Sequence, residues 1–385
     1  MKKIFNLENL IYLTILALPS YLLRFNLGIF HVNLLDGLLI LCIFIWAIRR
    51  REKSECALFL KRRKEFICCV AVIFLGLVIS VLVGKNYSVG LGIIKSWYLL
   101  PIAFSLVVRT EFKYGRIENV FLVYYISAFV VSLISLWYYF LGVLTFDFRL
   151  QGFFNSPNYL AMYLAPAIFI GYDLFSKVRA EKKLFVIGSG LSVFYALYLT
   201  YSYASWAAIL IAIAIVLVAE KEMKIGKALI IIIIVSVLCF FQIGKDKFSY
   251  LASGNSRSSL ASRIMIWHSA ENMLESNWLW GIGAGNFQET YLIYQKDFPP
   301  YLEWAVPHPH NLYLAWWLYG GILGLAGFIM LICFWFRGLF ELQKNPSLKL
   351  MGLGIMCYIL LHGLVDTTYF KNDLAVVFWL LFALF

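Results

Sequence analysis

The segment FICCVAVIFLGLVISVLV, residues 66–83, decides how this chain folds. It contains no charged residue, and as a helix rising about 1.5 Å per residue it can cross a hydrocarbon layer of roughly 30 Å. Lipid offers no hydrogen bonds, so the backbone groups of such a segment must pair within a helix. The sequence therefore predicts a transmembrane helix at residues 66–83.

Apolar runs of this kind recur along all 385 residues, of which 62% are hydrophobic and only 14% charged. A soluble domain carries roughly a quarter charged residues. We therefore predict an all-α, polytopic membrane protein, a single integral membrane domain over residues 1–385 with about twelve transmembrane helices. The expected spans are approximately 8–23, 33–48, 66–83, 89–108, 117–144, 157–176, 184–201, 203–219, 227–243, 311–336, 349–367 and 373–385.

The formal net charge of +12 is concentrated in alternate loops. Residues 49–64 and 177–183 contain basic clusters, whereas the short loops on the opposite side hold only Arg24, Lys85, Arg149 and Lys371. Lys and Arg collect on the cytoplasmic side of membrane proteins. This pattern predicts that both termini are cytoplasmic, and it argues against a nucleic-acid partner.

One extracytoplasmic connection is long: residues 244–310, between the ninth and tenth expected spans. Long loops without structure are uncommon unless they are functional. After the candidate caps Ser258 and Ser259, apolar residues recur at helical spacing. They are Leu260, Ile264, Trp267, Ala270 and Leu274. We expect an amphipathic helix lying along the membrane surface.

Arginines on the outer side are candidates for binding an anion. Arg149, in FRLQGFFNSPN, could hold a phosphate or sugar, or could only anchor the chain among lipid headgroups. Arg263, in SRIMIWHSA, shares a helix face with Trp267 and could stack on it. Its guanidinium could grip a pyrophosphate, or pair with lipid phosphates. Arg257 competes for the same role.

The stretch PHPHNLYLAWWLYGG, residues 307–321, begins where the long loop ends. His310 precedes an expected helix, whose dipole disfavours the imidazolium, so it could act as a general base. Two alternatives remain: a His that caps the helix, and a metal pair with His308. The metal pair would need further ligands, for which Asp297 and Glu303 are the nearest candidates.

Three further features carry less information. Lys95 lies inside an expected span and could be functional, or could snorkel to the outer surface. His362 and Asp366 are four residues apart in the eleventh expected span, where they could face a cavity or join helices. The GIGAG segment, residues 281–285, follows no predicted strand, so we expect a tight turn rather than a nucleotide loop.

Three blocks of the chain stand in this order: RLQGFFNSPNYLA, SRIMIWHSAENMLESNWLWGIGAGNF and HPHNLYLAWWLYGGILGLAGF. A fourth and weaker block is LHGLVDTTYFKNDLAVVFWLLFAL. In sequence and order, the three blocks together resemble the O-antigen ligase and polymerase family, membrane glycosyltransferases that use lipid-diphosphate-linked glycans.

The resemblance implies a twelve-helix bundle in the bacterial inner membrane, with a long periplasmic loop over a cavity open to lipid. The implied donor is an undecaprenyl-diphosphate-linked glycan, transferred with inversion and without metal or cofactor. By resemblance, Arg263 and His310 are catalytic, binding the diphosphate and activating the acceptor hydroxyl. The substrate-binding candidates are Arg149, Arg257, His308, Asn311, Trp267, Lys95 and Tyr203.

The family commonly has Ser-Arg-Gly between spans seven and eight, where this chain has Ser202, Tyr203 and Ala204. A tyrosine cannot neutralise a phosphate, so Lys95, Arg149 or Arg257 would have to compensate.

The expected function is ligation of the glycan to lipid A core in lipopolysaccharide biosynthesis. The alternatives are an O-antigen or exopolysaccharide polymerase, which uses another glycan as acceptor, and a lipid-glycan transporter. A transporter usually shows internal repeats and charges at mid-bilayer. Here the polar groups gather at one face, which favours the enzyme.

Overall fold

The computed structural model describes residues 6–27, 30–49, 64–112, 116–220, 240, 242–243, 248–249, 258–299, 306–342 and 345–384. The expected span 227–243 therefore lies outside the described residues, apart from 240 and 242–243. Of the long loop 244–310, residues 258–299 and 306–310 are described, with 248–249.

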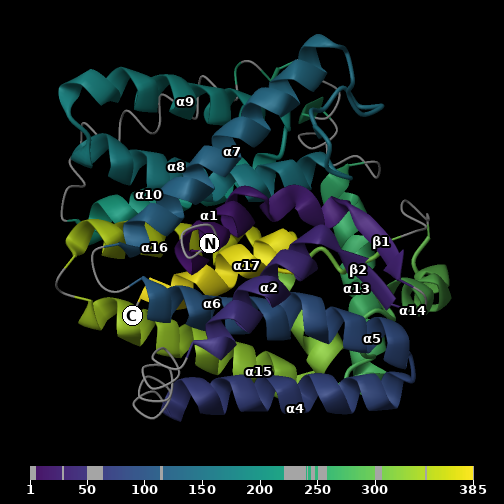
Figure 1. Ribbon diagram of the computed structural model, residues 1–385. Coiled ribbons are helices and arrows are strands. Elements are labelled where there is room, and N and C mark those ends of the chain that lie inside the picture. The colour runs from purple at the N-terminus through teal and green to yellow at the C-terminus, as the bar shows by residue number, and fades with distance from the viewer. Residues whose placement is uncertain are drawn as a thin grey trace.

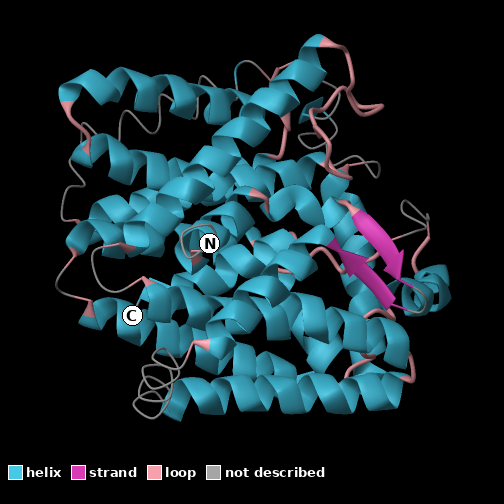
Figure 2. Cartoon of the chain, in the orientation of Figure 1, coloured by secondary structure: helices cyan, strands magenta, loops and turns pink. Residues whose placement is uncertain are grey.

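The described chain is almost entirely helical, with the helices running side by side as a bundle (Figures 1 and 2). Their positions agree with the remaining expected spans to within a few residues. In chain order the helices are α1 (Leu7–Leu16), η1 (Leu18–Leu22), α2 (Leu34–Ile48), α4 (Lys64–Gly84), α5 (Tyr87–Ile93), η2 (Ile94–Leu99), α6 (Leu100–Glu111), α7 (Ile117–Phe140), α8 (Pro157–Lys177), α9 (Ala180–Leu199), α10 (Tyr203–Ala219), α13 (Ser259–Asn277), α14 (Phe287–Tyr294), η3 (Gln295–Asp297), α15 (Leu312–Glu341), α16 (Pro346–His362), α17 (Asn372–Leu380) and η4 (Leu381–Leu384).

Six helical segments of the described chain are long and apolar enough to cross a membrane. They are α4, the continuous run Tyr87–Glu111, α7, α8, α9 and α15. The other apolar helices are shorter: α1, α2, α10, α16 and the run Asn372–Leu384. Together these helices make the chain a multi-pass membrane protein.

The prediction of a purely helical chain needs one correction. After η1 the chain forms an antiparallel hairpin of β1 (Arg24–Leu27) and β2 (Phe30–Asn33), with Arg24 opposite Asn33. The hairpin lies at the same end of the bundle as α13 and α14 (Figure 1). Backbone groups that leave a helix still need partners, and the two short strands supply them to each other. Asn33 then caps α2 by accepting a hydrogen bond from the Asp36 amide at 2.8 Å.

Helix α15 is broken once, at Gly321, whose φ is +62°. Residues with a side chain rarely adopt this conformation. Nearby, the carbonyl of Leu318 accepts a hydrogen bond from the amide of Ile282 at 2.8 Å. Ile282 belongs to segment 281–285, which forms a tight turn as predicted, with φ +87° at Gly283. The turn docks the segment that follows α13 onto α15.

Only part of the predicted apolar face of α13 is buried: Ala270 and Leu274 pack inward as expected. Leu260 and Ile264 are exposed, at 43% and 42%, although both were expected on the apolar stripe. The side chains that pack inward include Met265, Ile266 and Met273. The buried face of α13 therefore only overlaps the predicted one, because the helix packs against α14 and α15.

Helix α17 is surrounded by other helices near the centre of the bundle (Figure 1). Every residue from Asp373 to Leu380 is buried. An apolar helix buried on all sides is typical of a bundle core. Its N-terminus is therefore held firmly, and with it the loop 363–371 that connects α16 to α17.

Candidate active site

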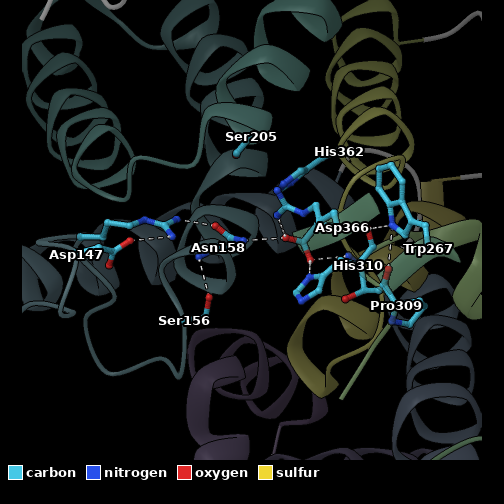
Figure 3. A network of polar contacts seen from close by, with 12 residues as sticks. Asp147, Ser156, Asn158, Ser205, Trp267, Pro309, His310, His362 and Asp366 are labelled. Atoms are coloured by element: carbon cyan, nitrogen blue, oxygen red, sulfur yellow. Dashed lines mark hydrogen bonds and ion pairs between the residues drawn. The ribbon is translucent and has the colours of Figure 1, made fainter. Parts of the chain in front are cut away.

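The carboxylate of Asp366 is the centre of a polar cluster that joins segments far apart in the sequence (Figure 3). Its Oδ1 accepts hydrogen bonds from Nδ1 of His310 at 3.0 Å and from the amide of Thr367 at 2.9 Å. Its Oδ2 accepts from Nη2 of Arg263 at 3.0 Å and from Nδ2 of Asn158 at 2.9 Å. Asp366 is only 1% exposed, so these donors satisfy a carboxylate that is almost out of contact with solvent.

The members of this cluster stand at helix ends. Asn158 is in the first turn of α8, and Arg263 is in the second turn of α13, which Ser258 caps through its hydroxyl oxygen. Asp366 follows the end of α16 at His362. The prediction that His362 and Asp366 share one helix was therefore wrong. The chain turns after His362, and that turn directs Asp366 towards the other helix ends.

Arg149 extends the cluster through Asn158. Its Nη2 donates to Oδ1 of Asn158 and its Nε donates to the carbonyl of Thr200, both at 2.7 Å. Asp147 forms an ion pair with Nη1 at 3.7 Å. Burial lowers the pKa of Arg149, against the opposing effect of the Asp147 carboxylate. The side chain is only 12% exposed and turned inward, which disfavours the alternative of an anchor among lipid headgroups.

The backbone at His310 is strained. Its φ is +47°, a left-handed conformation that costs a residue with a side chain about 1–3 kcal/mol. The indole N–H of Trp267 lies 3.1 Å from the carbonyl oxygen of Pro309 and 3.3 Å from that of His310, within hydrogen-bonding distance of both. Trp267 thus fixes the conformation of the His310 segment. In the described part of the chain, no cation–π contact is recorded between Trp267 and Arg263.

The N-cap of α15 is Asn311 and not His310. The Asn311 side-chain oxygen accepts from the amides of Tyr313 and Leu314 at 2.9 and 3.0 Å. Its Nδ2 donates to the carbonyl of Leu364 at 2.9 Å. Asn311 therefore joins the start of α15 to the loop that carries Asp366, which leaves the His310 imidazole free of a capping role.

The hydrogen bond to Asp366 decides which ring nitrogen of His310 carries a hydrogen. Burial by itself would raise the pKa of Asp366, but His310, through its charge and its hydrogen bond, and then the Arg263 guanidinium hold that pKa well below its usual range. An ionised carboxylate can only accept hydrogen bonds. Nδ1 of His310 must therefore carry the hydrogen, and Nε2 is the atom left for exchanging protons with a substrate. The side chain is 31% exposed, so a substrate can reach it.

Arg263 keeps binding capacity beyond its pair with Asp366. Its side chain is 14% exposed. Its Nε is buried and has no hydrogen-bond partner among the described residues. A buried unpaired donor is costly, and a phosphate oxygen is an acceptor that would satisfy it.

His308 lies apart from the carboxylate and packs among aromatic rings. Its Nδ1 is 2.8 Å from the hydroxyl of Tyr319, and the rings of Trp97 and Phe370 lie against it. Burial lowers the pKa of His308 to about 3. The two histidines of the alternative metal pair thus have separate partners. Among the residues that the structure describes, no three His, Cys, Asp or Glu side chains are grouped to hold a metal ion.

Two of the remaining predicted residues, Lys95 and Tyr203, have other partners. Lys95 forms an ion pair with the buried Asp36, Nζ to Oδ2 at 2.9 Å, within the π-helical segment η2. The hydroxyl of Tyr203 donates to Oε1 of Gln242 at 3.0 Å. Arg257 lies outside the described residues.

Sequence reasoning did not identify Asn158, and it treated Asp366 only as a possible partner of His362. His362 instead places its Nδ1 2.9 Å from the hydroxyl of Tyr358, which in turn contacts Ser205. One signal was present: Asn158 follows Pro157 at a helix start, where side-chain amides are common. Nothing in the spacing of Asp366 pointed to residues more than fifty positions away.

Residues 188–329 match the family model described as O-antigen ligase. The matched segment includes α10, α13, α14 and the first half of α15, and with them Arg263 and His310. Asp366 and Asn158 lie outside it. A search of curated proteins found no match.

Proposed function

We propose, from the match of residues 188–329 to the O-antigen ligase family model, that this chain transfers a glycan from a lipid diphosphate to an acceptor hydroxyl at the outer face of the bacterial inner membrane. The observation that carries the proposal is the contact of Arg263 and His310 with the same carboxylate, that of Asp366. Glycan transfer from a diphosphate needs a cation at the leaving group and a base at the acceptor. The cluster supplies both within one site.

In the proposed reaction, Nε2 of His310 takes the proton of the acceptor hydroxyl. The acceptor oxygen forms a bond to the anomeric carbon as the bond from that carbon to the diphosphate oxygen breaks. The electron pair of the broken bond stays on the lipid diphosphate, whose charge Arg263 stabilises. A single displacement inverts the anomeric centre. Protein side chains supply every group that this scheme uses, so it calls on no metal and no cofactor.

Asp366 acts in this scheme by holding His310. Its carboxylate keeps the hydrogen on Nδ1 and stabilises the imidazolium that forms when Nε2 accepts a proton. Asn158 donates to Oδ2 of this carboxylate, and Arg149 donates in turn to Asn158. Asp366 is therefore a positioning residue, whereas Arg263 and His310 touch the substrates.

The acceptor we propose is the lipid A core, with an undecaprenyl-diphosphate-linked glycan as donor. The test uses purified protein in proteoliposomes with both substrates, and the product is read on a lipopolysaccharide gel. We expect His310→Ala and Arg263→Ala each to abolish transfer, while His268→Ala, which alters an exposed histidine on α13, transfers normally. Wild-type product from either site variant would overturn the mechanism.

A gene deletion in the cell that produces the protein distinguishes ligation from polymerisation. Deletion of a ligase leaves bare lipid A core and accumulated lipid-linked polymer. Deletion of a polymerase leaves core that carries a single repeat. We expect the first pattern. The second would mean that the protein uses the same donor with another glycan as acceptor. Movement of the lipid-linked glycan across the membrane without formation of a glycosidic bond would instead indicate a transporter.

A further inference from the structure

Lys371 lies beside the Asp366 cluster without being one of its hydrogen-bonded members. It is the residue before α17, five positions after Asp366. Its Nζ is 3.4 Å from the centre of the Tyr159 ring and 5.6 Å from that of Tyr21. Tyr159 directly follows Asn158, which donates to Asp366. The ammonium group is therefore held by aromatic rings at the edge of the polar cluster.

Three other cations of this region already have carboxylate partners. Arg263 is paired with Asp366, Arg149 with Asp147, and Lys95 with Asp36. In the described ranges of the chain, Lys371 has no carboxylate within ion-pairing distance. Lys371 therefore supplies positive charge that the protein itself has not neutralised by direct contact.

Among the described residues, five groups contact Lys371 or interact with its charge. Asp373 and Arg24 act on its charge from beyond contact, with opposite effects. The Oδ1 of Asp373 accepts a hydrogen bond from the amide of Leu374 in its own helix. The other three are the Tyr159 and Tyr21 rings and His308. His308 is neutral near pH 7, so it adds no positive charge there.

We infer that Lys371 binds the diphosphate of the lipid-linked donor, as a cation of the site held between Tyr159 and Tyr21 until the anion arrives. The inference rests on the proposed function. A diphosphate linked at both ends carries two negative charges, whereas the two arginines of the cluster are each offset by a carboxylate. Cation–π contact is worth only about 0.5–2 kcal/mol, so an anion can draw the ammonium group away from the rings.

Because the Lys371 ammonium can lose its proton, donor binding should depend on pH. Burial lowers the pKa of Lys371 to about 8, with Asp373 opposing this effect and Arg24 adding to it. Binding that needs the ammonium is complete below this pKa and is lost as the pH rises through it. An arginine keeps its charge throughout this range. Lys371→Arg should therefore bind the donor equally well at pH 7 and pH 9, while the wild type weakens.

The test measures binding of an undecaprenyl-diphosphate-linked glycan, whose diphosphate is linked at both ends, to the full chain in nanodiscs. Lys371→Met keeps the apolar contact with the rings and removes the charge. We expect it to weaken binding at least about tenfold and to raise the KM for donor with little change in kcat, because the lost charge acts on binding. Lys371→Arg should restore the affinity. The matched control is Lys85→Met, which removes an exposed lysine in another connection between helices.

Wild-type affinity in Lys371→Met would overturn the inference. So would wild-type binding that does not change between pH 7 and pH 9, a readout that does not depend on whether the Met variant folds. Failure of the proposed function is a separate result: transfer would then survive His310→Ala or Arg263→Ala, whatever Lys371→Met does to diphosphate binding.

Discussion

Nδ1 of His310 donates to Oδ1 of Asp366 at 3.0 Å, although the two residues are 56 positions apart and on different helix ends. The carboxylate is buried, while the imidazole is partly exposed. Because Nδ1 is used in this hydrogen bond, Nε2 is the ring atom available for proton transfer. The four predictions below test parts of the arrangement around it.

Replacing Asp366 with Asn should reduce transfer roughly 10²- to 10⁴-fold, because an amide no longer holds the hydrogen on Nδ1 or stabilises the imidazolium. The measurement is the initial rate of transfer in proteoliposomes. Since Asp366 acts through His310, the double variant His310→Ala/Asp366→Asn should be no slower than His310→Ala alone. Glu289→Gln, on the exposed face of α14, is the control. Losses that simply multiply in the double variant would argue against a shared role.

Replacing Trp267 with Phe should lower kcat about tenfold, because the segment before α15 loses the indole donor that fixes the carbonyls of Pro309 and His310. Trp278→Phe alters an exposed tryptophan in the same connection and should leave kcat unchanged. Steady-state kinetics with saturating donor make the comparison. Equal effects in the two variants would mean that general loop packing, and not the hydrogen bond, matters.

Replacing Asn311 with Ala should lower the free energy of unfolding by about 1 kcal/mol, the usual cost of losing a helix cap. It should also lower transfer, because Asn311 joins the start of α15 to the Asp366 loop. Asn345 caps α16 in the same manner. We expect Asn345→Ala to lose comparable stability and keep its activity. Thermal unfolding and transfer are measured on the same preparations, and full activity in Asn311→Ala would contradict the positioning role.

His308 should make stability depend on pH. Its pKa is about 3 in the fold and about 6.5 when unfolded, so between these values the unfolded chain binds the extra proton. The stability contributed by the neutral ring is complete above about pH 6.5 and is lost as the pH falls towards 3, by at most about 1.4 kcal/mol per unit.

The His308 prediction is checked by Tm measurements between pH 4 and pH 7.5. His308→Phe keeps the ring packing and should show a flatter profile than the wild type, whereas His268→Gln should follow the wild type. Identical slopes in His308→Phe and wild type would show that other groups cause the acid sensitivity.

Several features of the fold could be predicted because each depends on neighbours in the chain. The apolar segment 66–83 became α4, and Ser258 caps α13 as expected. The hairpin at residues 24–33 was missed, since its pairing satisfies backbone groups at the end of a bundle whose arrangement the sequence does not display. The buried face of α13 was predicted only in part for a similar reason: the helix packs against α14 and α15, and the local pattern does not show where they lie.

By itself, the sequence determined that this chain is a bundle of apolar helices and that His310 and Arg263 are chemically suited to a polar site. Hydropathy and helix-end preferences act over a few residues, which is why they can be read locally. Only the tertiary structure decided that Asp366 joins those two residues, that Lys95 pairs with Asp36, and that Lys371 lies against the Tyr159 ring. A buried charge is tolerated only where distant segments bring it partners, and that meeting depends on how the helices pack.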